Sequence, residues 1–126
     1  MSLRTPLARA KGLGSAKEGV SHWWGQRVTA IALVPLTLWF AISIVGLVGA
    51  DHSTVAAWLQ QPVQAALMIL FLLTTFYHAQ LGIQVVVEDY VHVEGAKTGL
   101  VLGLKFLLAI LAAVAVLSVL RVAVGG

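Results

Sequence analysis

The chain has 126 residues, 60% of them hydrophobic and only 10% charged, and its mean hydropathy of +0.95 excludes a soluble domain and indicates an integral membrane protein. The net charge of +3 comes from few positive residues, concentrated before the first apolar run, so it reflects membrane topology rather than nucleic-acid binding. Because the chain has no cysteine, it cannot hold an iron–sulfur cluster through its own thiolates or form a disulfide.

Residues 1–27 form a basic segment that we expect to remain in the cytoplasm. The segment has no apolar stretch that could serve as the core of a signal peptide. Its end, Ser21 to Arg27, combines aromatic rings and a cation, which both favour the headgroup region of a bilayer. The positive charges that predict its side of the membrane are Arg4, Arg9, Lys11, Lys17 and Arg27.

The first span is expected at about residues 28–49, which is long enough to cross the hydrocarbon. Pro35 should kink it. Residues 50–61 then contain no Lys or Arg, which places them outside by the positive-inside rule. Ser53 is a candidate cap for a short interfacial helix that carries Trp58.

The second span is expected at about residues 62–87, with Pro62 in its first turn. Its polar residues fall on two arcs of a helical wheel, which indicates that this helix faces protein or cofactors over much of its circumference. One arc is an interhelical hydrogen-bonding face or, as a weaker alternative, a proton path. That arc holds Tyr77, Gln80, Gln84 and Glu88, and the other holds Thr75, His78, Gly82 and Asp89.

The third span is expected at about residues 99–119, after a cytoplasmic loop over residues 88–98. Gly95, Gly99 and Gly103 recur every four residues, and such a ridge of small residues lets another helix approach closely. The rest of this span is interpreted as packing surface without a buried charge. Residues 28–126 therefore form one membrane domain of three helices.

His78 lies near the bilayer centre, where an imidazole needs a partner for its nitrogens. Hydrogen bonding, proton relay and metal binding are all open to it. The small residues Thr75 and Gly82 on either side favour haem, whose iron commonly takes a histidine ligand. The other three histidines lie at or beyond the interfaces, so a second axial histidine would have to come from another subunit.

Tyr90 and Asp89 lie where the second span meets the cytoplasm. Their simplest interpretation is an interfacial anchor. Alternatively, the Tyr90 phenol donates a hydrogen bond to a quinone carbonyl, while Asp89 orients nearby basic groups or relays protons. Arg27 enters the first span from the same side and can pair with Asp89, with a haem propionate or with lipid phosphate.

The motif His78, Gly82, Asp89 and Tyr90 on the second of three spans, preceded by residues 26–31 at the start of the first, resembles the succinate dehydrogenase hydrophobic membrane anchor family. The resemblance covers roughly residues 21–91. It implies that His78 is an axial ligand of a haem b shared with the other anchor. It also implies that Tyr90 hydrogen-bonds ubiquinone with Asp89 beside it, and that Arg27 lies near the haem propionates.

The sequence thus predicts an all-α integral membrane protein with its amino terminus in the cytoplasm and its carboxyl terminus in the periplasm of a bacterial inner membrane. The family implies partnership with a flavoprotein, an iron–sulfur subunit and a second, cytochrome b556-type anchor of succinate dehydrogenase, with no catalysis by this chain alone. A fumarate reductase anchor and a cofactor-free transport or assembly subunit remain alternatives.

Overall fold

The computed structural model of the protein describes residues 13–125, with side chains from residue 20 onward. Within this part of the chain there are four helices and no strand: α2 (Leu13–Gly46), α3 (His52–Leu59), α4 (Pro62–Tyr90) and α5 (Glu94–Ala123). Three of them are long and apolar enough to cross a membrane, over Val20–Gly46, Pro62–Tyr90 and Glu94–Ala123. The predicted all-α fold with three spans is confirmed. Arg4, Arg9, Lys11 and the side chain of Lys17 lie outside the described residues.

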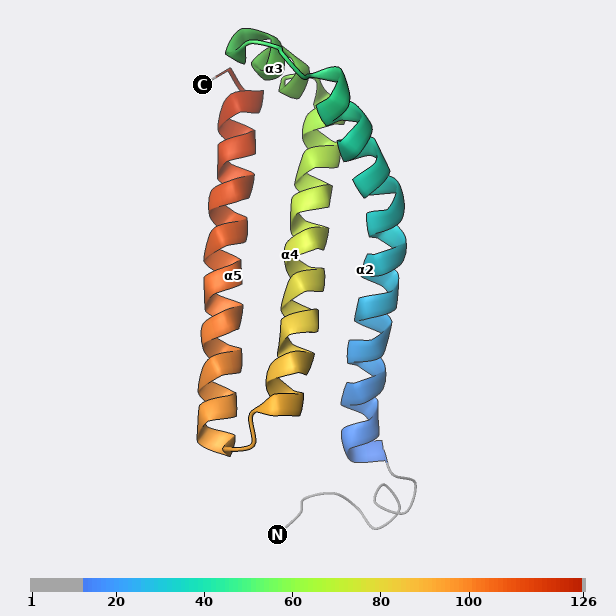
Figure 1. Ribbon diagram of the computed structural model, residues 1–126, viewed down its shortest axis with the longest axis vertical. Helices are drawn as coiled ribbons and strands as arrows, with labels where there is room; N and C mark the ends of the chain where they lie inside the picture. The colour runs from blue at the N-terminus through green and yellow to red at the C-terminus, as the bar shows by residue number, and fades with distance from the viewer. Residues whose placement is uncertain (1–12, 126) are drawn as a thin grey trace.

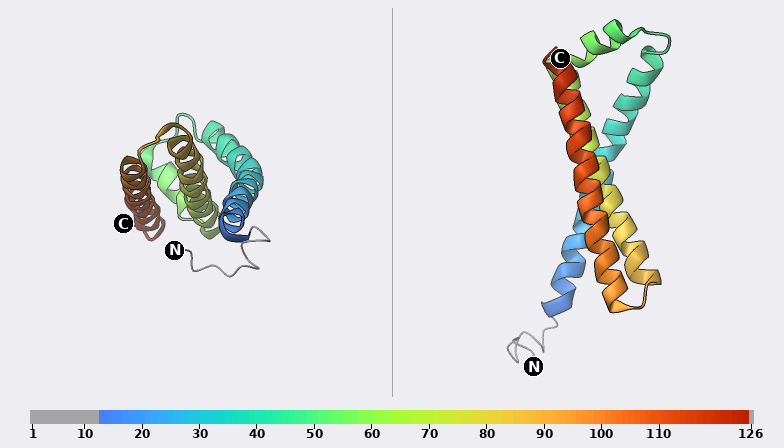
Figure 2. Two further views of the ribbon diagram at one scale, coloured as in Figure 1. Left: turned by 90° about the horizontal axis from the view of Figure 1, so that it is seen from below. Right: turned by 90° about the vertical axis from the view of Figure 1, so that its left-hand side faces the viewer.

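Helix α4 lies between α2 and α5, which contact α4 but not each other. Figure 1 shows the three long helices side by side, and the end-on view in Figure 2 shows them in an open arc. The start of α2, the end of α4 and the start of α5 lie together at one end of the bundle, which we call the Tyr90 end. The opposite end carries α3 and the end of α5, so the start of α2 and the end of α5 lie at opposite ends of the bundle.

Helix α2 begins at Leu13, well before the expected start of the first span at residue 28. Helical hydrogen bonding does not stop where the apolar run stops, because polar residues also form helix at a membrane surface. Pro35 lies inside α2, and the half of α2 that follows it leans back toward α3 in Figure 1. Helices α4 and α5 likewise extend a few residues beyond the expected spans.

The short interfacial helix α3 is present, but its cap is Asp51 rather than Ser53. The Asp51 carboxylate accepts a hydrogen bond from the Thr54 backbone N–H at 2.9 Å, and the Ser53 hydroxyl donates to the same carboxylate oxygen at 3.1 Å. Both residue types cap helices well. The helix begins at His52, so the preceding Asp51 takes the capping position.

Aromatic side chains join α2, α3 and α4 at the α3 end of the bundle. Trp39 stacks on Trp58 with ring centroids 5.8 Å apart, and Phe40 stacks on Phe71 at 4.8 Å. The Trp39 indole N–H also donates to Gln64 Oε1 at 2.9 Å. Because offset stacking adds to the area that such rings bury, this cluster holds α2 against α4 far from the Tyr90 end.

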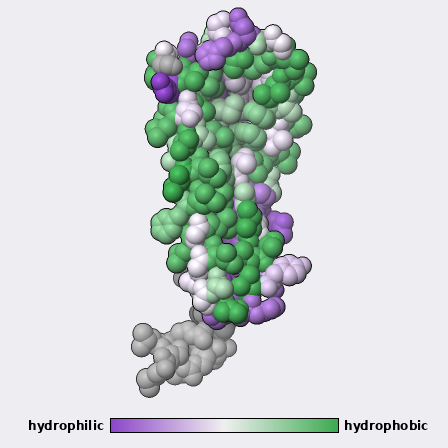
Figure 3. All heavy atoms as spheres, turned by 60° about the vertical axis from the view of Figure 1, so that its left-hand side comes forward, coloured by the Kyte–Doolittle hydropathy of each residue, from purple (hydrophilic) through white to green (hydrophobic). Residues whose placement is uncertain are grey.

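The described chain has almost no interior. Only Leu81 and Thr29 are buried, at 5% and 9% exposure. Green apolar atoms cover most of the lateral face seen in Figure 3, with purple concentrated near the two ends, as lipid and partner helices require. The glycine ridge of α5 is open, since a Cβ at Gly95, Gly99 or Gly103 would meet no described atom within 4 Å.

Candidate functional site

His78 of α4 faces Thr29 of α2, and the distance from His78 Nδ1 to Thr29 Oγ1 is 2.8 Å. The helical rise of about 1.5 Å per residue places His78 roughly 18 Å along α4 from Tyr90, within the apolar span. The ring is half-buried. Among residues 20–125, the Nε2 atom of this ring has no hydrogen-bond partner, so one ring nitrogen is engaged within the chain and the other remains available.

Gly82 lies one turn after His78 and faces α2, at a distance where a Cβ would make ordinary van der Waals contact. A Cβ at Gly82 would lie 3.6 Å from Gln26 Nε2 of α2. Gly82 also lines a hollow of about 400 Å³ between the two helices, together with His22, Trp23, Gln26, Arg27 and Val85. The hollow adjoins Gly82, but His78 is not among the residues that line it. Thr75, on the other side of His78, is exposed.

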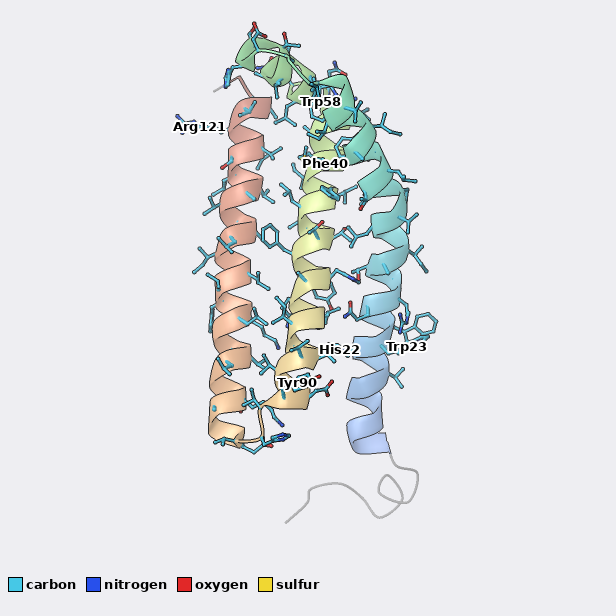
Figure 4. The ribbon with its side chains drawn as sticks, viewed as in Figure 1. His22, Trp23, Phe40, Trp58, Tyr90 and Arg121 are labelled. Atoms are coloured by element: carbon cyan, nitrogen blue, oxygen red, sulfur yellow. The ribbon has the colours of Figure 1, made fainter. Side chains whose placement is uncertain are left out.

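Two residues that line the hollow, His22 and Gln26, each carry a buried polar atom without a hydrogen-bond partner among residues 20–125. These atoms are His22 Nε2 and Gln26 Oε1. Figure 4 shows His22 between α2 and α4. Buried polar atoms are normally satisfied, so these two atoms are exceptions among the described residues.

Arg27 lies at the same hollow and stacks on Trp23, with its guanidinium carbon 5.3 Å from the ring centroid. Trp23 itself points away from α4 (Figure 4). The described residues contain no ion pair between Arg27 and Asp89; the ion pair that they do contain joins Lys97 to Glu94 at 3.4 Å. Among residues 20–125, Arg27 therefore has no ion-pair partner beside the hollow.

Tyr90 is the last residue of α4 and 78% of its side chain is exposed. Asp89 is exposed as well. Tyr90 lies at the end of the bundle where α2 begins (Figure 4), so His22, Arg27, Asp89 and Tyr90 all lie toward one end of the molecule. An exposed phenol is free to meet a partner subunit or a ligand.

The polar arc of α4 hydrogen-bonds along its own helix. Gln80 Nε2 donates to Gln84 Oε1 at 2.6 Å, and Gln84 Nε2 donates to Glu88 Oε1 at 2.9 Å. These bonds lie within one helix, whereas the sequence favoured bonds between helices. A second hollow, of about 300 Å³, adjoins this arc and is also lined by Tyr77 and by Lys105 of α5.

Two polar residues in this region were not singled out from the sequence. Thr29 is buried and contacts His78. The sequence feature that could have identified it is a hydroxyl residue just after Arg27 in an otherwise apolar run. Lys105 lies in the apolar third span, where a lone charge six residues after Gly99 could have drawn attention to it.

Within the described residues, no group of three or more His, Asp or Glu side chains is placed to hold a metal ion. A haem iron needs only an axial ligand from one chain.

The model of the succinate dehydrogenase/fumarate reductase transmembrane subunit family matches residues 1–120 of the chain. The chain is 36% identical to a succinate dehydrogenase hydrophobic membrane anchor subunit of Rickettsia bellii over 102 residues, which cover 81% of this chain and 82% of the relative. It is 32% identical to the subunit of the same name in Paracoccus denitrificans over 121 residues, 96% of this chain and 93% of the relative.

A third relative is the succinate dehydrogenase membrane anchor subunit of Reclinomonas americana, which is 33% identical over 88 residues, 68% of this chain and 72% of the relative. The family model extends beyond residues 21–91, on which the resemblance was based, and includes the expected third span. The chain therefore belongs to the succinate dehydrogenase/fumarate reductase transmembrane subunit family, as a multi-pass membrane protein similar to the hydrophobic membrane anchors of succinate dehydrogenase.

Proposed function

We propose that this chain anchors succinate dehydrogenase to the membrane, ligates a haem b through His78 and forms part of the ubiquinone-reduction site. The observation that carries the proposal is the half-buried His78 ring in the middle of the bundle, with Nδ1 bound to Thr29 and Nε2 available. In a purely structural role, both nitrogens of an intramembrane histidine would be expected to find partners.

A haem would lie beside α2 and α4. His78 Nε2 would ligate the haem iron, and the cationic Arg27 at the hollow would hold the acidic groups at the edge of a porphyrin. When bound, haem supplies a one-electron carrier. The described residues offer no second histidine at the depth of His78, so the other axial ligand would come from a second membrane anchor.

Tyr90 would bind the quinone at the surface of the membrane. Negative charge develops on a quinone carbonyl during reduction, and a phenol can donate a hydrogen bond to it without becoming charged. The high exposure of Tyr90 leaves its hydroxyl accessible, and Asp89 beside it can orient basic groups of a partner. In this scheme a flavoprotein oxidises succinate, an iron–sulfur subunit delivers the electrons, and this chain supplies binding and polarisation.

An anchor of a fumarate reductase is the second candidate, because the description of the matching family includes that enzyme. The same His78 and Tyr90 would serve it with electrons flowing in the opposite direction. Steady-state rates of succinate oxidation and fumarate reduction by the purified complex decide between the two enzymes. We place the complex in a bacterial inner membrane, with the Tyr90 end facing the cytoplasm.

The test of haem ligation is the optical spectrum of the complete complex carrying His78→Ala, with His52→Ala as the matched control. His52 lies in α3 at the far end of the bundle and is exposed. We expect the low-spin b-type spectrum to be lost or altered in the His78 variant alone. An unchanged spectrum in an intact His78→Ala complex would place the ligand elsewhere, and no haem in the parent complex would favour a transport or assembly subunit.

A further inference from the structure

The Thr29 hydroxyl is bonded on two sides. Besides His78 Nδ1 at 2.8 Å, Thr29 Oγ1 lies 2.6 Å from the Gly25 carbonyl oxygen and 3.1 Å from that of Gln26. A hydroxyl carries one hydrogen, and carbonyl oxygens only accept. Two oxygens 2.6 Å apart repel each other unless a hydrogen lies between them, so the Thr29 hydrogen is on the Gly25 side.

The remaining contact of Thr29 therefore has a defined direction. With its hydrogen committed to Gly25, Thr29 Oγ1 can only accept from His78, so Nδ1 of the ring must carry a hydrogen. A neutral imidazole has only one such hydrogen, which leaves a lone pair on Nε2. The contact thus selects the tautomer in which Nε2 can bind a metal.

The surroundings hold this arrangement in place. Thr29 is one of two buried residues among those described, and Leu81, the other, packs against Gly25 one turn along α2 from Thr29. The hydrogen bond between Thr29 and His78 is partly buried, which limits its exchange with water and so restricts the freedom of the ring to turn or to change tautomer. We propose that Thr29 is a positioning residue that fixes the orientation and tautomer of His78 and raises the basicity of its Nε2 toward the haem iron.

This inference rests on the proposed haem ligation by His78. An acceptor for the far N–H of a histidine ligand strengthens electron donation to the metal, and loss of such a partner typically costs roughly 10- to 100-fold in metal affinity. Stronger donation favours ferric over ferrous iron. Removing the acceptor should therefore shift the haem midpoint potential upward and weaken haem retention, while leaving His78 itself in place.

The experiment compares Thr29→Val, Thr29→Ser and Ser118→Ala in the complete complex. Valine keeps the volume of threonine without the hydroxyl, and serine keeps the hydroxyl. Ser118 Oγ donates to the Val114 carbonyl at 2.7 Å on α5, so its replacement removes a hydroxyl-to-carbonyl bond far from His78. The readouts are the haem midpoint potential, the haem content after dilution and the electron paramagnetic resonance g values, which report ring orientation.

We expect Thr29→Val to raise the potential, lower haem retention about tenfold or more and change the g values, with parental behaviour in the other two variants. A parental potential in Thr29→Val, or the same shift in Thr29→Ser, would overturn the inference. If the Thr29→Val complex does not assemble, Thr29→Cys takes its place, because the cysteine thiol is of similar size but is a weaker hydrogen-bond acceptor. A raised potential in Thr29→Cys would then support the inference, and a parental potential would overturn it. Loss of haem in His78→Ala together with a parental Thr29→Val would refute only the positioning role, whereas retention of haem in His78→Ala would refute the haem ligation itself.

Discussion

Gly25 of α2 and Leu81 of α4 meet so closely that a Cβ atom at Gly25 would lie 3.0 Å from Leu81 Cδ1. The same Gly25 carbonyl receives the Thr29 hydroxyl, and Thr29 contacts His78. The absence of a side chain at one position of α2 therefore sets the spacing at which the two helices meet around the candidate haem ligand.

Gly25→Val should push α2 away from α4 and lower the stability of the assembled complex. Overpacking a tight contact costs about 1–3 kcal/mol, so we expect a lower Tm and weaker haem retention. Differential scanning calorimetry of the complex measures the Tm, and optical titration measures the haem retention. Gly46→Val is the matched control in the same helix, because a Cβ there meets no described atom within 4 Å. Equal Tm values for the two variants would contradict the prediction.

Tyr90→Phe should leave assembly and the haem spectrum intact while lowering quinone reduction. Loss of one donor at a reacting oxygen costs on the order of tenfold or more in rate. Succinate-dependent reduction of an artificial acceptor that bypasses quinone should persist, which provides the internal control. If quinone reduction by the Phe variant equals that of the parent over all quinone concentrations, Tyr90 is an interfacial anchor only.

The orientation of the chain can be tested with reporter fusions. The Tyr90 end should face the cytoplasm, because the positive charges precede the first span and residues 50–61 contain no Lys or Arg. Since α3 and the end of α5 lie at the opposite end of the bundle (Figure 1), a periplasm-dependent reporter after Gly126 should be active. The same reporter inserted after His92 should be silent, and activity at that site would reverse the assignment.

The stabilisation of α3 by its Asp51 cap should depend on pH. Hydrogen bonds from the Thr54 side chain and backbone, followed by that from the Ser53 hydroxyl, lower the pKa of Asp51 below its ordinary value of 3.8. Because the pKa is lower in the folded state, the stabilisation of α3 is present above about pH 3.8 and is lost as the pH falls through the folded-state pKa.

Hydrogen exchange at the Thr54 amide, corrected for the intrinsic rate, measures this cap. Protection should fall at low pH in the parent chain but not in Asp51→Asn, which caps without a titrating group. Asp51→Ala should lose protection at every pH. Protection in Asp51→Ala equal to that of the parent would show that the carboxylate does not stabilise the helix.

The three spans could be predicted from the sequence because long apolar runs have only one stable solution in lipid, which is a helix. Their ends could not, because the helix continues from the apolar run into the interface, as it does from Val20 back to Leu13 in α2. The cap of α3 was misassigned to Ser53 because Asp51 and Ser53 have similar capping preferences, and only the backbone shows which of them precedes the first turn.

The positions of His78 and Tyr90 along α4 followed from counting residues on a helix. The pairing of His78 with Thr29 could not be predicted, because it depends on how α2 is rotated about its own axis against α4. The pattern of polar and apolar residues indicates such a rotation only when one face of the helix is distinctly polar. In α2 nearly every face is apolar. The Gln80 to Gln84 bond was likewise expected between helices, although a spacing of four residues also allows it within one helix.

Because only two residues of the described chain are buried, most of its surface must be covered by lipid or by other protein chains. Newly inserted, its three helices expose to lipid the hollow around His22 and the open ridge of α5, and those surfaces become interior only when other molecules arrive. We therefore expect a copy that is synthesised without its partners to keep these surfaces exposed.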